Sequence, residues 1–168
     1  MRLVAQHPYG DRWWLLRYRH PVTGAKELSW ESINPKGERV PGLLGTPTRD
    51  LPLYRERDIL KGMALDEPVL LVESESSVDA LMGWYATTWA GGAACPPIER
   101  LQAVLGGYPH LVVIPDADGP GVDCLGRLID AGLVPNLLHG EHGEDARDLY
   151  QRVGPSGFRR LIDNELIS

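Results

Sequence analysis

The chain has 168 residues, of which 43% are hydrophobic and 24% are charged, and this composition predicts a folded globular protein rather than a disordered one. No apolar run approaches the roughly 20 residues of a membrane-spanning helix, and the N-terminus lacks the apolar segment of a signal peptide, so we expect a cytoplasmic protein. The net charge of −6 is uneven, because residues 1–66 carry 11 basic and 8 acidic side chains whereas residues 67–168 carry 6 and 15.

Residues 1–66 are predicted to form a basic, β-rich N-terminal region. The sequence predicts one strand over residues 13–19 and a second over 25–33, joined by a turn with proline and glycine at 21–24. Prolines and glycines then interrupt any regular element until a short helix near residues 55–63. This region therefore resembles a small hairpin-rich appendage to a larger unit.

Residues 67–168 are predicted to form that larger unit, because apolar strands alternate with helices there. The expected strands cover residues 68–73, 87–93, 111–114 and 134–138. The expected helices cover residues 76–86, 96–107, 120–133, 144–154 and 155–166. Continuous apolar strands that alternate with helices predict an α/β fold with a mainly parallel sheet and helices on both faces.

Acidic side chains follow three of these predicted strands. Glu73 ends the first, Asp116 and Asp118 follow the third, and Asp145 and Asp148 follow the fourth after a short loop. In parallel α/β sheets ligands bind outside the carboxyl ends of the strands, so these acids are expected to converge. Two carboxylates ~4 Å apart repel by about 4 kcal/mol at an effective dielectric near 20. A bound Mg²⁺ or Mn²⁺ relieves that repulsion, and such a site can orient a phosphodiester or a nucleoside triphosphate.

Several of these acids also have a purely structural interpretation. Glu75 is either a further acid of the site or a first-turn charge that faces a helix dipole. Asp79 stands three residues after Ser76, and we favour a capping box for this pair. Asp116 and Asp118 are also typical turn residues. A phosphatase with a nucleophilic aspartate is disfavoured, because this Asp-x-Asp pair lies on an inner strand and is followed by Gly-Pro-Gly.

Two segments resemble the motifs of a Toprim domain, the module shared by bacterial and phage-type primases, topoisomerases and certain nucleases. The first is "LLVESESSVDAL", an apolar strand that ends in glutamate before a helix, and the second is "VVIPDADGPG", a strand that runs into Asp-x-Asp-x-x-Gly. The segments "ATTWAGG" and "GEDARDL" are similar to variants found in phage and plasmid primases. The resemblance covers about residues 66–154 and is closest to the Toprim region of those DNA primases.

The resemblance implies a role for each acid. Glu73 corresponds to the motif glutamate, which is a general acid/base in some members and a metal-site residue in others. Asp116 and Asp118 correspond to the Mg²⁺-binding pair, and Asp145 and Asp148 would complete the acidic site. The family has glycine after the glutamate where this chain has a serine at position 74. If that position needs a positive φ, serine is a strained substitute and full activity is in doubt.

The strand over residues 13–19 is predicted to separate a core face from a nucleic-acid face. Trp14, Leu16 and Tyr18 lie on one face and suit a core. The opposite face carries Trp13, Leu15, Arg17 and Arg19, with Lys26 across the hairpin. The cations of that face are predicted to contact a phosphate backbone, and the exposed indole of Trp13 is predicted to stack on a base. The alternative is a hairpin packed against the α/β sheet with a solvated arginine edge.

These features predict a Mg²⁺-dependent protein that acts on nucleic acid. The first hypothesis is primase-like nucleotidyl transfer in DNA replication, by a fragment or one half of a split primase. The expected partners are single-stranded DNA, nucleotides and a replicative helicase or second primase subunit. The cysteines form no C-x-x-C pair and no P-loop is present, which excludes a zinc ribbon and a built-in helicase. The alternatives are a Toprim nuclease and a non-catalytic binding module with a degenerate site.

Overall fold

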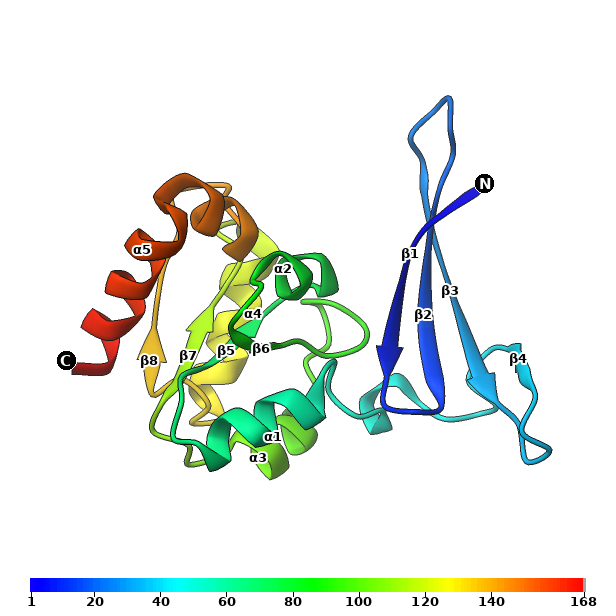
Figure 1. Ribbon diagram of the computed structural model, residues 1–168, viewed down its shortest axis with the longest axis horizontal. Coiled ribbons are helices and arrows are strands. Elements are labelled where there is room, and N and C mark those ends of the chain that lie inside the picture. The colour runs from blue at the N-terminus through cyan, green and yellow to red at the C-terminus, as the bar shows by residue number, and fades with distance from the viewer. Residues whose placement is uncertain (168) are drawn as a thin grey trace.

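The computed structural model describes residues 1–167, which form two four-stranded sheets side by side (Figure 1). The first sheet is antiparallel in the order β1-β2-β3-β4 and comprises β1 (Arg2–Tyr9), β2 (Trp13–Arg19), β3 (Lys26–Ile33) and β4 (Arg39–Pro41). The second sheet is parallel in the order β6-β5-β7-β8 and comprises β5 (Val69–Val72), β6 (Tyr85–Thr87), β7 (Leu111–Ile114) and β8 (Asn136–Leu137). The predicted α/β class with a hairpin-rich N-terminal region is therefore confirmed.

The helices follow the predicted order with two changes at their ends. They are the 3₁₀ helix η1 (Thr48–Asp50), α1 (Glu56–Ala64), α2 (Glu75–Ala80), α3 (Ile98–Leu105), α4 (Gly119–Asp130) and α5 (Ala146–Ile167). α2 ends at Ala80, earlier than predicted, and β6 occupies Tyr85–Thr87 rather than residues 87–93; Gly83, with a φ of 86°, lies in the turn between them. The two helices predicted after residue 144 are the two halves of α5, which are separated by the non-helical backbone of Gly154.

The parallel sheet is covered on both faces, and alternate residues of its central strands belong to different cores. One core contains Leu70, Val72, Val112 and Ile114. It is covered by α2 and α5 and by part of the antiparallel sheet. The other core contains Val69, Leu71, Leu111 and Val113. It is covered by α1, α3 and α4. Burial on both faces explains why these strands read as unbroken apolar runs in the sequence.

The antiparallel sheet packs against the α/β sheet, as the alternative expected, and it does so through the face of Trp13 and Leu15, so the predicted assignment of faces was wrong for these residues, although Leu16 on the opposite face is buried as predicted. Tyr9 is opposite Trp13, and His7 is opposite Leu15. Residues that are directly opposite in an antiparallel pair share a face, so β1 extends the surface that β2 presents. Leu15 is only 5% exposed and belongs to the core under α2 and α5. β1 was not predicted, because Pro8 and exposed side chains obscure its alternation.

No helix among residues 1–167 is long and apolar enough to cross a membrane.

Candidate functional site

The central strands β5 and β7 bring Glu73 and Asp116 into direct contact. These strands are parallel neighbours in register, with Val72 opposite Ile114, so the residues that follow them leave the sheet at the same edge. The Asp116 backbone N–H donates to Glu73 Oε1 over 3.0 Å. From β5 the chain goes first to β6 on one side and then to β7 on the other. The two acids therefore lie at the topological switch point, which is where open α/β sheets bind ligands.

A backbone connection between two loops places the later acids beside Asp116. The Ala117 N–H donates to the Glu144 carbonyl over 2.9 Å, and the Gly143 N–H donates to the Ala117 carbonyl over 2.8 Å. Asp145 directly precedes α5, and its Oδ1 accepts from the Asp148 N–H over 2.8 Å. The negative charges of Asp145 and Asp148 are close enough to raise the pKa of the Asp116 carboxyl.

Burial and the repulsion between neighbouring negative charges raise the pKa values of Glu73 and Asp116. Glu73 is 9% exposed, and burial raises its pKa to about 7; the hydrogen bond from Asp116 opposes that rise, whereas the negative charges of Asp116 and Asp118 add to it. Burial, with the charges of Asp145, Asp118 and Asp148, raises the pKa of Asp116 to about 6. A carboxyl group with a pKa near 7 can both accept and donate a proton at neutral pH.

The donor set at this edge fits a weakly chelated divalent cation. Asp116 Oδ1 is buried and has no hydrogen-bond partner among the described residues, which suits an atom that awaits a ligand. Asp118 is exposed, and its Oδ1 accepts from the Gly121 N–H over 2.8 Å at the start of α4. Within residues 1–167 no three His, Cys, Asp or Glu side chains surround a common point as a closed metal cage would require. Mg²⁺ usually takes one or two carboxylates together with waters and phosphates, so Asp116 and Asp118 are the residues that could hold it.

The glycine of the Asp-x-Asp-x-x-Gly motif is required by close packing. A Cβ atom on Gly121 would lie 2.1 Å from the Asp116 carbonyl oxygen and 3.0 Å from Glu73 Oε1. Only a residue without a side chain lets the first turn of α4 approach the end of β5 so closely. Gly121 therefore sets the spacing between the two carboxylates and the helix.

Ser74 is unstrained, because it lies in extended backbone with φ −142° and ψ 150°. Its side chain caps α2 by accepting from the Ser77 N–H over 3.2 Å. The predicted capping box of Ser76 and Asp79 was therefore wrong, since the cap lies two residues earlier. Asp79 instead accepts from the Tyr54 hydroxyl over 2.8 Å. The doubt about positive φ at this position does not apply to this chain.

Glu75 connects α2 to the antiparallel sheet. Its buried carboxylate accepts from the Tyr9 hydroxyl over 2.5 Å and lies 3.7 Å from the Arg17 guanidinium. One turn later, Asp79 lies 3.1 Å from His7 Nδ1, although neither ring nitrogen makes a hydrogen bond of normal geometry within the described residues. Both acids of α2 thus contact the N-terminal region, and Figure 1 shows α2 on the side of the parallel sheet that faces it. Glu75 therefore lies in the first turn of α2, as the structural interpretation expected, but it is buried and paired with the antiparallel sheet rather than solvated.

The four residues predicted to bind nucleic acid occupy different surroundings. Arg19 and Lys26 are exposed and directly opposite each other at the far end of the hairpin. The Arg17 side chain is 22% exposed and is held beside Glu75. Trp13 is half-buried against the core, with the Arg12 guanidinium 5.4 Å from its ring centre.

Two residues that contact the predicted acids were missed by sequence reasoning. Arg147 lies 3.2 Å from Asp145 and 3.6 Å from Asp148, and its place between two acids in "GEDARDL" was an available signal. Tyr9 contacts Glu75 although the two residues are 66 positions apart in the chain, and no local sequence pattern predicts that contact.

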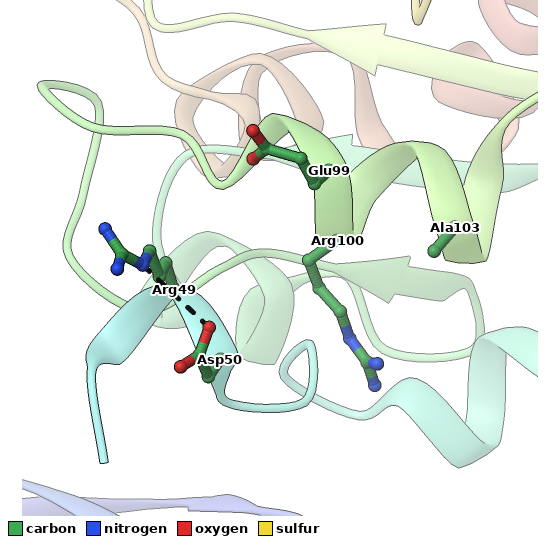
Figure 2. Close-up of a pocket in the computed structure, with 5 residues that line it drawn as sticks. All are labelled: Arg49, Asp50, Glu99, Arg100 and Ala103. Atoms are coloured by element: carbon green, nitrogen blue, oxygen red, sulfur yellow. Dashed lines mark ion pairs between the residues drawn. The ribbon is translucent and has the colours of Figure 1, made fainter. Parts of the chain in front are cut away.

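A cavity of about 540 Å³ lies away from these acids, between η1 and α3. Its lining is Arg49, Asp50, Glu99, Arg100 and Ala103 (Figure 2). Arg100 is already paired with Glu56 over 2.6 Å, and Arg49 lies 3.9 Å from Asp50. None of the predicted site residues lines it, so the acids and this hollow are separate features.

The fold is similar to solved DNA primase structures. A DNA primase domain from Pseudomonas aeruginosa matches with a TM-score of 0.60 and 20% identity, over 92% of this chain and 51% of that one. The E. coli primase catalytic core matches with a TM-score of 0.55 and 18% identity, over 91% and 52%. A DnaG primase catalytic domain bound to ssDNA matches with a TM-score of 0.57 and 15% identity, over 89% and 52%.

These similarities show the fold alone, because the sequence identities are low. The chain spans about half the length of these structures. No protein-family model and no curated protein matches it. The architecture is nevertheless that of primase catalytic cores, which confirms the predicted Toprim-type arrangement.

Proposed function

We propose that this chain carries out primase-like nucleotidyl transfer on nucleic acid, with a divalent cation as cofactor. The observation that carries the proposal is the contact between Glu73 and Asp116 at the switch point of a primase-type sheet. Burial raises the pKa of Glu73 to about 7, which matches the requirement of a general base at neutral pH.

In this proposal the acids divide the work. Glu73 accepts the proton of the attacking hydroxyl, whose oxygen bonds to the α-phosphorus of a nucleoside triphosphate as pyrophosphate leaves, and the proton then passes to solvent. Asp116 and Asp118 hold Mg²⁺ or Mn²⁺, which when bound neutralises the phosphate oxygens of a nucleotide. Gly121 keeps Glu73 and Asp116 at contact distance by leaving room for the first turn of α4.

The exposed end of the hairpin is the proposed contact for single-stranded DNA. Arg19 and Lys26 lie opposite each other there, in a region whose net charge is positive. Similar primase structures include one described as bound to ssDNA, which supports the same class of partner. Arg17 and Trp13 contribute less in this proposal, because the first is held beside Glu75 and the second packs on the core.

The test is primer synthesis on labelled single-stranded DNA with nucleoside triphosphates and Mg²⁺. Wild-type protein is expected to elongate, and Glu73→Gln is expected to lose roughly 10²- to 10⁴-fold of that activity, as expected for removal of a general base. Glu67→Gln is the matched control, because this exposed acid precedes the same strand at its opposite end. Equal activity of Glu73→Gln and wild type would contradict the proposal.

The same assay separates the alternatives. Cleavage of the labelled strand without synthesis would assign the acids to phosphodiester hydrolysis. DNA binding without synthesis or cleavage would identify a non-catalytic module. Mg²⁺ is expected to raise the melting temperature of wild type more than that of Asp116→Ala combined with Asp118→Ala, and equal shifts would remove the metal from the proposal.

A further inference from the structure

Arg147 is a cation within the set of acids at the carboxyl edge of the parallel sheet. It lies in the first turn of α5, with its guanidinium 3.2 Å from Asp145 and 3.6 Å from Asp148. A guanidinium is charged at every physiological pH and matches the geometry of carboxylates. The negative charge on this side of the site is therefore compensated by the chain itself.

The other side of the site has no such ion pair, although the positive charge of Arg147 also opposes the rise in the pKa of Asp116. Among the described residues, no Lys, Arg or His side chain pairs with Asp116 or Asp118 within 4.0 Å, whereas Asp145 and Asp148 share one cation. Asp116 Oδ1 is buried without a partner. The two halves of the acidic edge thus differ in their ion pairs, although the charges of Asp145, Asp118 and Asp148 are all close enough to raise the pKa of Asp116.

We propose that Arg147 takes the place of a metal ion on Asp145 and Asp148, so that the protein binds a single divalent cation, at Asp116 and Asp118. This inference rests on the divalent-cation site of the proposed function. A second dication at Asp145 would have to displace the guanidinium or lie within a few ångströms of it, where two positive centres repel strongly. Asp145 and Asp148 then bind the guanidinium of Arg147 and do not act as metal ligands.

The chain offers a matched control for the removal of this charge. Arg152 lies on the same helix and pairs with Glu144 over 2.6 Å and with Glu141 over 3.1 Å. Its side chain is 41% exposed, the same fraction as that of Arg147. Arg152→Ala therefore removes one positive charge of equal exposure without freeing Asp145 or Asp148.

In the experiment, electron paramagnetic resonance measures the concentration of free Mn²⁺. The total minus the free concentration gives the number of ions bound per protein. Wild type and Arg152→Ala are expected to bind one ion, and Asp116→Ala none. Arg147→Ala is expected to bind a second ion, which Asp145→Asn in the same background removes. Arg147→Gln gives the same reading with a side chain closer in size, in case the alanine variant does not fold.

Each outcome decides the inference. Two ions bound to wild type, or one ion bound to both wild type and the Arg147 variants, would overturn the role of Arg147 while leaving the metal of the proposed function in place. No ion bound to any of these proteins would overturn both at once. A second ion in Arg152→Ala would show that any loss of positive charge suffices, and would overturn the specific role of Arg147.

Discussion

The two sheets of this protein use polar side chains in opposite ways. In the antiparallel sheet, β1 alternates between exposed and buried residues over its second half, whereas all four residues of β5 and of β7 are buried. On the inner face of the antiparallel sheet, Tyr9 donates to Glu75 of α2, and the buried His7 ring lies 3.1 Å from Asp79 of the same helix without a hydrogen bond of normal geometry. At the end of β7, by contrast, Asp116 keeps a buried oxygen without a partner.

In the proposed function, this difference separates an interface that holds the two sheets together from a site that binds a ligand. A satisfied buried hydrogen bond contributes roughly 1 kcal/mol to stability, whereas a buried polar atom without a partner costs stability until something binds it. Substitutions in the interface between the sheets should therefore lower stability, and substitutions of the site acids should preserve or raise it. The predictions below test that contrast in order of decreasing effect.

The largest effect is expected at Gly121, where the fold and the site meet. Gly121→Ala places a methyl group 2.1 Å from the Asp116 carbonyl oxygen, so the backbone must shift, and we expect a loss of about 3 kcal/mol in the free energy of unfolding. Gly126→Ala is the control on the same helix, since its Cβ would meet open space and alanine is the better helix former by about 1 kcal/mol. Urea denaturation measures both, and similar values for the two variants would contradict the close packing.

The next effect is expected at the interface between the sheets. Tyr9→Phe leaves the buried Glu75 carboxylate without its phenol donor, and we expect a loss of about 2 kcal/mol in the free energy of unfolding. Tyr18→Phe is the control, because this residue is on the face of β2 that points away from Glu75. If both variants unfold at the same urea concentration, the hydrogen bond contributes nothing to holding the sheets together.

A smaller effect of opposite sign is expected at the site. The pKa of Asp116 in the folded protein is raised to about 6. Its ionisation therefore lowers the free energy of unfolding as the pH rises from the pKa of the unfolded state to the pKa of the folded state. Asp116→Asn removes that cost. Without divalent cations it should be more stable than wild type by about 1–2 kcal/mol at pH 8, after discounting for partial solvent exposure, with a smaller difference at pH 4. Thermal unfolding at both pH values measures the difference, and a variant less stable than wild type at pH 8 would refute the assignment.

The smallest effect is expected at the exposed end of the hairpin. Arg19→Ala combined with Lys26→Ala should leave stability unchanged and reduce the salt dependence of single-stranded DNA binding by about 1.4 in slope, the value for two lost phosphate contacts. Lys36→Ala combined with Lys61→Ala removes the same charge from other exposed positions. Fluorescence anisotropy over a salt series measures the slopes, and equal slopes for the two double variants would remove the hairpin from the DNA-binding surface.

Much of this structure could be predicted from local pattern. The buried strands β5 and β7 appear as unbroken apolar runs, and the acids that follow them identify the edge of the sheet where Glu73 and Asp116 meet. The helix starts were less accurate, because Ser74 and Ser76 are both plausible caps and only backbone geometry decides between them. The prediction of which face of β2 packs inward was wrong, because Trp13, Leu15 and Leu16 place apolar side chains on both faces.

The sequence by itself determined the alternation of strands and helices after residue 66, the parallel sheet and the set of acids at its carboxyl edge, since hydrophobic periodicity and chain direction are local properties. Only the tertiary structure decided which acids face each other and which are already paired. Glu75 meets Tyr9, and Arg147 lies between Asp145 and Asp148. Charge balance and desolvation depend on neighbours within a few ångströms, and folding, rather than sequence separation, chooses those neighbours.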